Sequence, residues 1–195
     1  SGPRFFWLSV MSAMNVFYEE DGGFKVGSVM ADNDTSLQVE APRGKRSKVK
    51  ASAVLLRFDA PPLSEFMAAA ERMADEIDVD FLWECCSQEE FDYATLAREY
   101  FGHAPGALES AAVLIRLHGA PMYFYKKGRG RYKAAPEASL KAALAGLERK
   151  KREAALRLEY VAALTAGQMP PAMLPLAKTL LYTPDKNSLE YKALD

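Results

Sequence analysis

The first part of the chain alternates apolar and polar residues in short runs, and this period of two is typical of β-strands. Gly, Asp, Asn and Pro interrupt the runs at 21–23, 32–34 and 42–44, where turns are expected. Five short strands are too few for a sandwich, so residues 14–60 are predicted to form a small SH3-like β-barrel. The strands are expected at 15–19, 24–31, 36–40 and 46–49, with a continuation over 51–58.

Helical spacing replaces the strand pattern after a pair of prolines at 61–62. Ser64 is placed to cap a helix, and Asp92 is placed to cap a later one that Gly102 ends. Another helix is predicted over 107–118. The apolar face of the helix after Ser64 is expected to consist of Phe66, Ala70, Met73 and Ile77.

A basic hairpin comes after the helix at 107–118, with strands expected at 122–126 and 131–134. Helix, turn, helix and then a hairpin is the order of elements in a winged helix. The fold class is therefore predicted as α+β, a barrel followed by a winged-helix unit and C-terminal helices. The expected divisions are 1–13 (a tag or N-terminal extension), 14–60 (barrel), 61–135 (helical and winged-helix domain with a wing at 121–134) and 136–195 (helical segment).

Within the last division, Pro136 fits the first turn of a long helix that reaches about residue 164. Its basic run at 149–152 is flanked by acids, so we interpret it as a solvated helix face. A Pro-Pro break at 170–171 leads to a final helical segment. The expected apolar stripe of the long helix is Leu140, Leu144, Leu147, Leu158 and Val161.

The positive charge is concentrated in two hairpins of a chain whose formal net charge is only −1. The runs at 43–50 and 126–133 each hold five Lys/Arg and no acid, ten of the 25 basic residues together. Cations on a narrow turn can follow a phosphate backbone, so both runs are candidate contacts to a polyanion. The candidate residues are Arg43, Lys45, Arg46 and Lys48 in the first hairpin and Lys126, Lys127, Arg129, Arg131, Tyr132 and Lys133 in the second.

The second hairpin is expected to be the better contact surface, and each hairpin also has a structural interpretation. Basic residues protect an edge strand from aggregation, which explains the run at 43–50 equally well. In the second hairpin, Tyr123, Tyr125 and Tyr132 are suited to stacking on unpaired bases. The alternative is that Met122 and Phe124 pack inward and the tyrosines only shield the hairpin.

Other chemistry finds less support in the sequence. The helix at 107–118 has Arg116 as its one Lys or Arg and no Asn or Gln, so it is predicted to be buried and not to read duplex DNA. Cys85 and Cys86 are adjacent, which disfavours a disulfide and favours a cytoplasmic location. A thiol–base pair with His103 lacks an orienting partner. The acid-rich stretch at 75–80 is interpreted as helix ends and not as a metal site.

Four segments resemble a branch of the bacterial ribonuclease II-like (RNB) exoribonucleases. They are FYEEDGGFKVG at 17–27, NDTSLQVE at 33–40, GKRSKVK at 44–50 and APMYFYKKGRGRY at 120–132. The resemblance implies metal-dependent 3′-to-5′ hydrolysis of single-stranded RNA. The family's catalytic part carries adjacent aspartates, and this chain has no Asp-Asp pair.

The resemblance therefore implies that this chain is the N-terminal, substrate-binding region of such an enzyme. It assigns no catalytic residue, metal ligand or cofactor to this chain. Mg²⁺ is expected in a separate C-terminal catalytic domain, which would be a partner besides single-stranded RNA. The apolar runs are too short for a transmembrane segment, and no membrane partner is expected. Two other functions stay open at this point, a protein-interaction module and a DNA-binding regulator.

Overall fold

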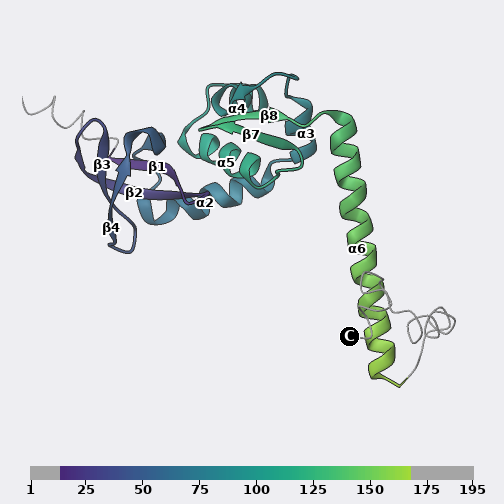
Figure 1. Cartoon of the computed structure of the whole chain (residues 1–195). Coiled ribbons are helices and arrows are strands. Elements are labelled where there is room, and N and C mark those ends of the chain that lie inside the picture. The colour runs from purple at the N-terminus through teal and green to yellow at the C-terminus, as the bar shows by residue number, and fades with distance from the viewer. Residues whose placement is uncertain (1–13, 168–195) are drawn as a thin grey trace, which may run out of the picture. The chain divides into compact units, whose positions relative to one another are not determined.

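The computed structural model describes residues 14–167 of a chain that divides into two compact units, 1–136 and 137–195. Each unit is described by itself. The first contains two antiparallel sheets and the helices α2 to α5 (Figure 1). Its elements are β1 (Asn15–Glu20), β2 (Gly23–Asp32), β3 (Ser36–Glu40), β4 (Arg46–Lys50), the 3₁₀ turn η1 (Ala51–Ala53), β5 (Val54–Phe58), α2 (Leu63–Glu76), α3 (Val79–Glu84), β6 (Phe91–Asp92), α4 (Tyr93–Phe101), α5 (Ala107–His118), β7 (Phe124–Gly128) and β8 (Arg131–Ala134).

The five predicted N-terminal strands are confirmed, and they form one sheet in the order β4-β3-β2-β1-β5. Successive side chains of β1 point to opposite faces of the sheet, which explains why both faces are covered. Phe17 faces the helices and joins the main core, whereas Val16 and Tyr18 belong to a smaller core on the other face. Val39 of β3 and Val49 of β4 complete that smaller core.

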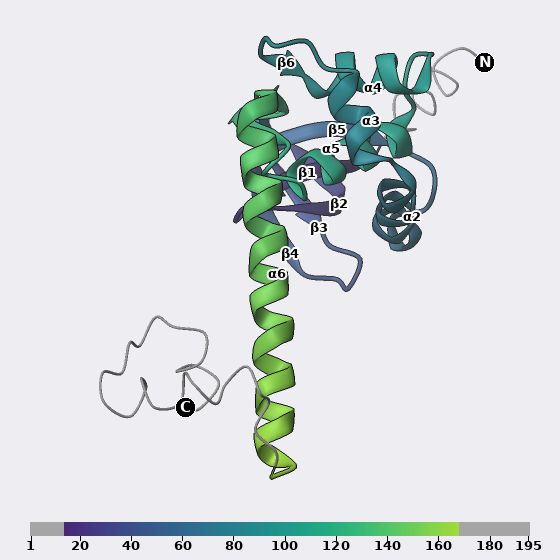
Figure 2. The same cartoon turned by 90° about the vertical axis from the view of Figure 1, so that its right-hand side faces the viewer.

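The predicted SH3-like barrel is not observed, because the sheet does not close. β4 and β5 lie at opposite edges, and η1 carries the chain from one to the other. A barrel requires the two edge strands to pair, and the described residues contain no such pairing. The sheet is therefore open, with β4 as one of its edge strands (Figure 2).

The helices of the first unit pack on that sheet through one shared core. Phe66 of α2 stacks on Phe58 of β5 with ring centroids 3.7 Å apart. Two predicted helix termini are confirmed: Asp92 accepts the N–H of Ala94 at the start of α4, and Gly102 ends it in a left-handed conformation. The expected cap at Ser64 is wrong, since α2 begins at Leu63 without a side-chain cap bond.

The second sheet has the order β6-β8-β7 and contains the predicted basic hairpin. Its strands β7 and β8 pair with Phe124 opposite Ala134 and Lys126 opposite Tyr132. Phe124 and Tyr132 are buried, so this face of the hairpin covers the helical core. We call the β7–β8 hairpin the wing.

The second unit contains α6 (Glu137–Thr165), the long helix that the sequence predicts. Its basic run at 149–152 is exposed, as expected for a solvated helix face. No helix within residues 14–167 combines the length and apolar composition needed to cross a bilayer. The predicted extension at 1–13 and the final helical segment after 170–171 lie outside the described residues.

Candidate nucleic-acid interface

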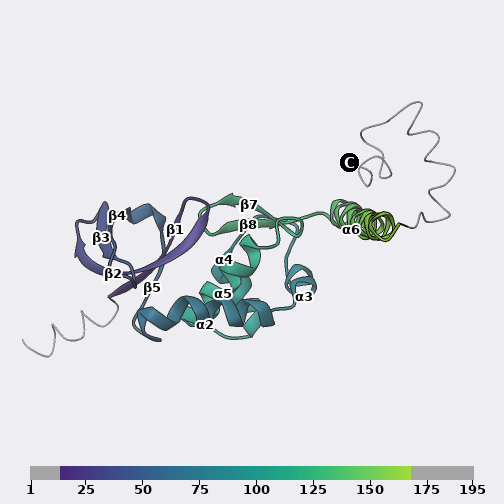
Figure 3. The ribbon, with the colours of Figure 1, turned by 90° about the horizontal axis from the view of Figure 1, so that it is seen from below.

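Helix α5 precedes the wing, which is the position of the recognition helix in a DNA-binding winged helix. None of its twelve residues is exposed. α2, α4, β5 and β7 all contact it, and His118 near its end meets the ring of Phe24 from β2 edge-on at 5.1 Å. Figure 3 shows α5 between these elements. The predicted burial of this helix is confirmed, and it cannot enter a major groove without unpacking the core.

The β3–β4 hairpin carries the first basic run on an exposed turn. The turn is closed by the N–H of Gly44 on the carbonyl of Ala41 and by the N–H of Ala41 on the carbonyl of Lys45, both at 2.8 Å. Arg43 and Lys45 are exposed at this turn. Their cations therefore lie at the tip of the hairpin and not in the core.

Strand β4 continues this charge as a row. Arg46, Lys48 and Lys50 alternate with Ser47 and Val49, so the three cations share one face of the strand. Arg46 is bound to Glu40 at 3.0 Å. In the part of the chain that the structure describes, no salt bridge involves Arg43, Lys45, Lys48 or Lys50. We call the two cations of the tip and the two cations of the row that form no salt bridge among residues 14–167 the β4 ridge (Arg43, Lys45, Lys48 and Lys50).

Lys50 was not among the candidates drawn from the sequence. Its spacing from Arg46 and Lys48 could have identified it, because residues two apart in a strand lie on the same face. Arg43 and Lys45 thus lie at the exposed turn and Lys48 on β4, where Lys50 adds a fourth cation.

The wing differs, because three of its five cations are engaged with the protein itself. Lys126 forms an ion pair with Glu19 of β1, and Arg129 donates to the carbonyl of Val54 at 2.7 Å. Arg131 donates to Glu90 at 2.7 Å, and this hydrogen bond raises the pKa of the Arg131 guanidinium. Such contacts on the surface are individually weak. Those of Lys126 and Arg129 reach the N-terminal sheet, whereas Arg131 is bound to the segment just before β6.

Two further contacts, both formed by Tyr93, hold the turn of the wing next to β5 of the N-terminal sheet. Tyr93 donates its hydroxyl to the carbonyl of Leu55 at 3.0 Å, and its N–H binds the carbonyl of Gly130 at 2.8 Å. Burial raises the pKa of the Tyr93 phenol, so it stays a neutral donor. We call this set of contacts, centred on Tyr93, Arg129 and Gly130, the wing clamp.

The remaining wing candidates fall into two groups. Lys127 is exposed and Lys133 is half-buried, and neither takes part in a salt bridge among residues 14–167. Tyr132 requires a correction, because its side chain is only 2% exposed and packs in the main core. It cannot stack on RNA in this conformation. Tyr123 donates to Asp80 at 2.9 Å, and Tyr125 is the most exposed of the three wing tyrosines.

The acid-rich stretch forms helix ends, as expected. α2 ends at Glu76, and Asp78 caps α3 by accepting the N–H groups of Asp80 and Phe81. No group of three or more His, Cys, Asp or Glu in residues 14–167 has a geometry that could hold a metal ion. Helix capping and the helix dipole therefore explain Asp78 and Asp80, whereas Asp75 and Glu76 are solvent-exposed at the end of α2.

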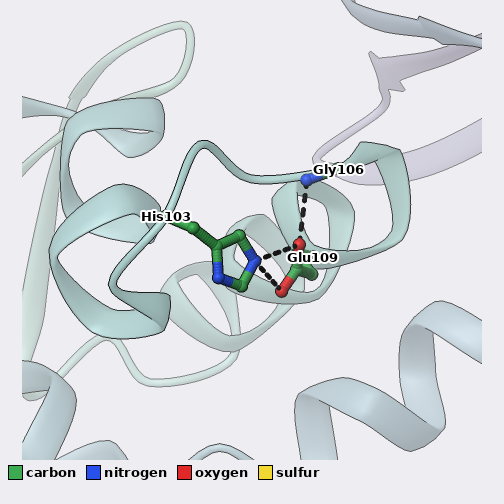
Figure 4. Close-up of polar contacts among 3 residues, drawn as sticks. All are labelled: His103, Gly106 and Glu109. Carbon is green, nitrogen blue, oxygen red and sulfur yellow. Dashed lines mark hydrogen bonds and ion pairs between the residues drawn. The ribbon is translucent and has the colours of Figure 1, made fainter.

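The cysteines and His103 do not come together as a thiol–base pair. Burial raises the pKa of Cys86 to about 12, and burial also raises the pKa of Cys85. The His103 ring instead contacts both oxygens of Glu109, at 2.9 and 3.0 Å (Figure 4). Glu109 also accepts the N–H of Gly106, so this cluster closes the start of α5. The pKa of Glu109 is lowered, first by the Gly106 N–H and then by His103.

A comparison with known protein families found a match to one part of the chain. Residues 65–139 match the family model of the ribonuclease II winged helix domain. The match runs from α2 through the wing to the first residues of α6. Searches of curated proteins and of solved structures gave no significant match. The sequence over 65–139 is thus ribonuclease II-like, and the fold of this segment agrees with the winged helix named by the match.

Proposed function

We propose that residues 14–136 are an RNA-binding region of a ribonuclease II-like protein, which binds single-stranded RNA through phosphate contacts from the β4 ridge. The observation that carries the proposal is the β4 ridge, whose four exposed cations form no salt bridge with residues 14–167, on a unit that includes a ribonuclease II-type winged helix. Lys127 and Lys133 of the wing provide a second, smaller group of contacts. Phosphate contacts carry no sequence information, so the binding is expected to be insensitive to base sequence.

The charge arrangement supports this order of importance. A cation that is already bound to a carboxylate gains less from a phosphate, because it must first lose its partner. Lys126 and Arg131 have such partners, whereas the four ridge cations form no salt bridge among the described residues. The ridge also lies on an edge strand, where a nucleic-acid strand can approach without displacing protein.

In this proposal the chain binds RNA and does not hydrolyse it. Metal-dependent 3′-to-5′ hydrolysis, with Mg²⁺, belongs to a catalytic domain of the same protein, which this region supplies with substrate. We propose a cytoplasmic location for the protein, where it would bind single-stranded RNA. The covered helix α5 supports RNA over duplex DNA, since the groove-reading surface of a DNA-binding winged helix is occupied.

The test is a titration with a single-stranded RNA, a single-stranded DNA and a duplex DNA of equal length at several salt concentrations. The ridge variant changes Arg43, Lys45, Lys48 and Lys50 to Ala. If each contributes one phosphate contact, the slope of log K against log salt falls by roughly 2 to 3 units, at about 0.7 per contact on a single strand. Poly-U and poly-A should lose affinity by similar factors.

The matched control removes the same number of charges from α6, by changing Arg149, Lys150, Lys151 and Arg152 to Ala. Ala is a strong helix former, so α6 should persist in this variant. We expect its salt slope to stay near that of the wild type. If the salt slope falls equally in the ridge variant and in this control, the loss is a non-specific charge effect. Tightest binding to duplex DNA would support a regulator instead, and absence of binding to all three would favour a protein-interaction module.

A further inference from the structure

Helix α6 of the second unit presents large apolar side chains to solvent. Leu158 is 70% exposed and Val161 is 40% exposed. Both belong to a row in which residues recur alternately after three and four positions, which is the average 3.5-residue period of coiled coils. Leu140 and Thr165 extend the same spacing over almost the whole helix. We call the central part of this row the α6 seam (Leu144, Leu147, Lys151, Ala154, Leu158 and Val161).

The opposite side of α6 has a separate set of apolar contacts. Tyr160 is 5% exposed and clusters with Leu156 and Leu164. These three residues are spaced four positions apart, and Tyr160 lies about half a turn from Leu158, since each residue turns a helix by about 100°. Burial on that side therefore does not cover Leu158 and Val161, and this part of the seam is accessible to a partner.

Cations lie within the seam and along one of its edges. Lys151 occupies a seam position, and Lys150 and Arg157, which are one heptad apart, follow one edge. The other edge carries Glu148 and then alanines at heptad spacing, so the charge is one-sided. Within residues 14–167, no salt bridge involves any of these three cations. Their charge is therefore available to a partner that lies along the seam.

The position of this charge decides between possible partners. Lys151 stands at the midpoint of α6, so two copies of the helix paired in either direction would bring their cations face to face. Like charges at facing helix positions destabilise a pair, which disfavours a second copy. A membrane surface fits less well, because the seam is narrow and contains no aromatic residue. A helix with carboxylates beside its own apolar seam satisfies both the apolar row and the cations.

We propose that the α6 seam binds an amphipathic helix of another protein, with leucine-type residues along its seam and acidic residues at the flanking positions. The inference goes beyond the proposed function, because it concerns the second unit and needs no RNA. Lys151 gives the pairing its register, since a cation inside an apolar seam requires a carboxylate of the partner at the same height. Leu158 and Val161 supply the apolar area that the partner covers.

The test uses two synthetic peptides of about four heptads, with Leu at the seam positions and either Glu or Lys at the flanking positions. The full chain is titrated into each labelled peptide, and binding is followed by fluorescence anisotropy. The Glu peptide should bind, with an affinity that falls as salt screens the facing charges. The Lys peptide should bind at least about tenfold more weakly, because each attractive pair becomes a repulsive one.

Four consecutive basic residues provide a matched pair of charge variants. Lys150→Ala with Lys151→Ala removes two cations at the seam and should weaken binding of the Glu peptide. Arg149→Ala with Arg152→Ala removes the same charge from positions away from the seam and should leave the affinity close to that of the wild type. Ala is a strong helix former, so circular dichroism should show α6 intact in both variants.

A third variant tests the apolar part of the seam. Leu158→Ala with Val161→Ala should weaken binding of the Glu peptide by about tenfold or more, because both side chains become buried in the complex. Both are exposed in the free chain, so thermal unfolding should change little.

Several outcomes would overturn the proposal. They are absence of binding to the Glu peptide, equal binding of both peptides, and equal losses in the two charge variants. Self-association of the chain that is lost in the Leu158 and Val161 variant would make a second copy the occupant. Binding to phosphatidylserine vesicles without binding to the Glu peptide would make it a membrane surface. The β4 ridge variant should bind the Glu peptide as the wild type does, so this proposal and the proposed function fail independently.

Discussion

Gly130 offers the most direct test of the wing clamp. Its φ is +66°, and a Cβ added there would lie 2.8 Å from Cδ1 and 3.2 Å from Cε1 of Tyr93. The ring of Tyr93 cannot retreat freely, because its hydroxyl is bound to the carbonyl of Leu55 and its backbone N–H to Gly130 itself. Gly130→Ala should therefore separate the wing from the N-terminal sheet.

The magnitude is the sum of two costs. A left-handed conformation costs a residue with a Cβ about 1–2 kcal/mol, and an overlap with a packed ring costs about 1–3 kcal/mol more. We therefore expect Gly130→Ala to lower the free energy of unfolding by about 2–5 kcal/mol. Gly44→Ala is the matched control, because Gly44 also has a positive φ, +93°, but open space where its Cβ would be. It should cost only the first amount, about 1–2 kcal/mol.

Urea denaturation followed by tryptophan fluorescence measures both variants, since Trp83 donates to the carbonyl of Ala135 within this unit. A cycle with Tyr93→Ala tests the mechanism: removing the ring removes the overlap, so Gly130→Ala should cost at least about 1 kcal/mol less in that background. Equal losses for Gly130→Ala and Gly44→Ala, or no coupling to Tyr93, would show that the clamp does not depend on this contact.

Three further predictions concern single groups. Tyr93→Phe, which keeps the ring and removes the hydrogen bond to Leu55, should destabilise the unit by about 0.5–1.5 kcal/mol in urea unfolding. Glu109→Ala should destabilise α5 at neutral pH. Because folding lowers the pKa of Glu109, the loss in unfolding free energy relative to the wild type should shrink as the pH falls below about 4.3 through the folded-state pKa. A loss that does not change with pH would contradict this. Burial raises the pKa of Cys86 to about 12, so Cys86 should react with iodoacetamide at pH 8 at least about tenfold more slowly than free cysteine. Cys85→Ala together with Cys86→Ala should leave RNA binding unchanged.

Local patterns predict most of the strands and helices of this fold. The period-two runs and their Gly/Asp/Asn turns give β1 to β5 within a few residues, and Asp92 and Gly102 mark the ends of α4. Ser64 is not the cap, because α2 already begins at Leu63, with Pro62 at the N-cap position, and Ser64 therefore lies inside the first turn. Barrel closure fails for a different reason. It depends on whether two distant edge strands meet, and no local residue pattern encodes that pairing.

The candidate site could be predicted only in part, because sequence shows where cations are but not what they contact. Glu19 lies 107 positions before Lys126, Val54 lies 75 before Arg129, and Glu90 lies 41 before Arg131. None of these partners stands out in the sequence around the wing. The two basic hairpins therefore look equivalent in composition, while the fold gives their charges different partners.

This difference explains how one unit can use similar hairpins for two purposes. An ion pair within a protein fixes geometry at a small net gain, whereas a cation without a partner keeps its full attraction for a phosphate. The wing uses Lys126, Arg129 and Arg131 to hold its position. The β4 ridge has no such salt bridges to lose among the described residues. In the proposed function, the ridge therefore supplies most of the affinity that depends on salt, and the wing adds only Lys127 and Lys133, which form no salt bridge among residues 14–167.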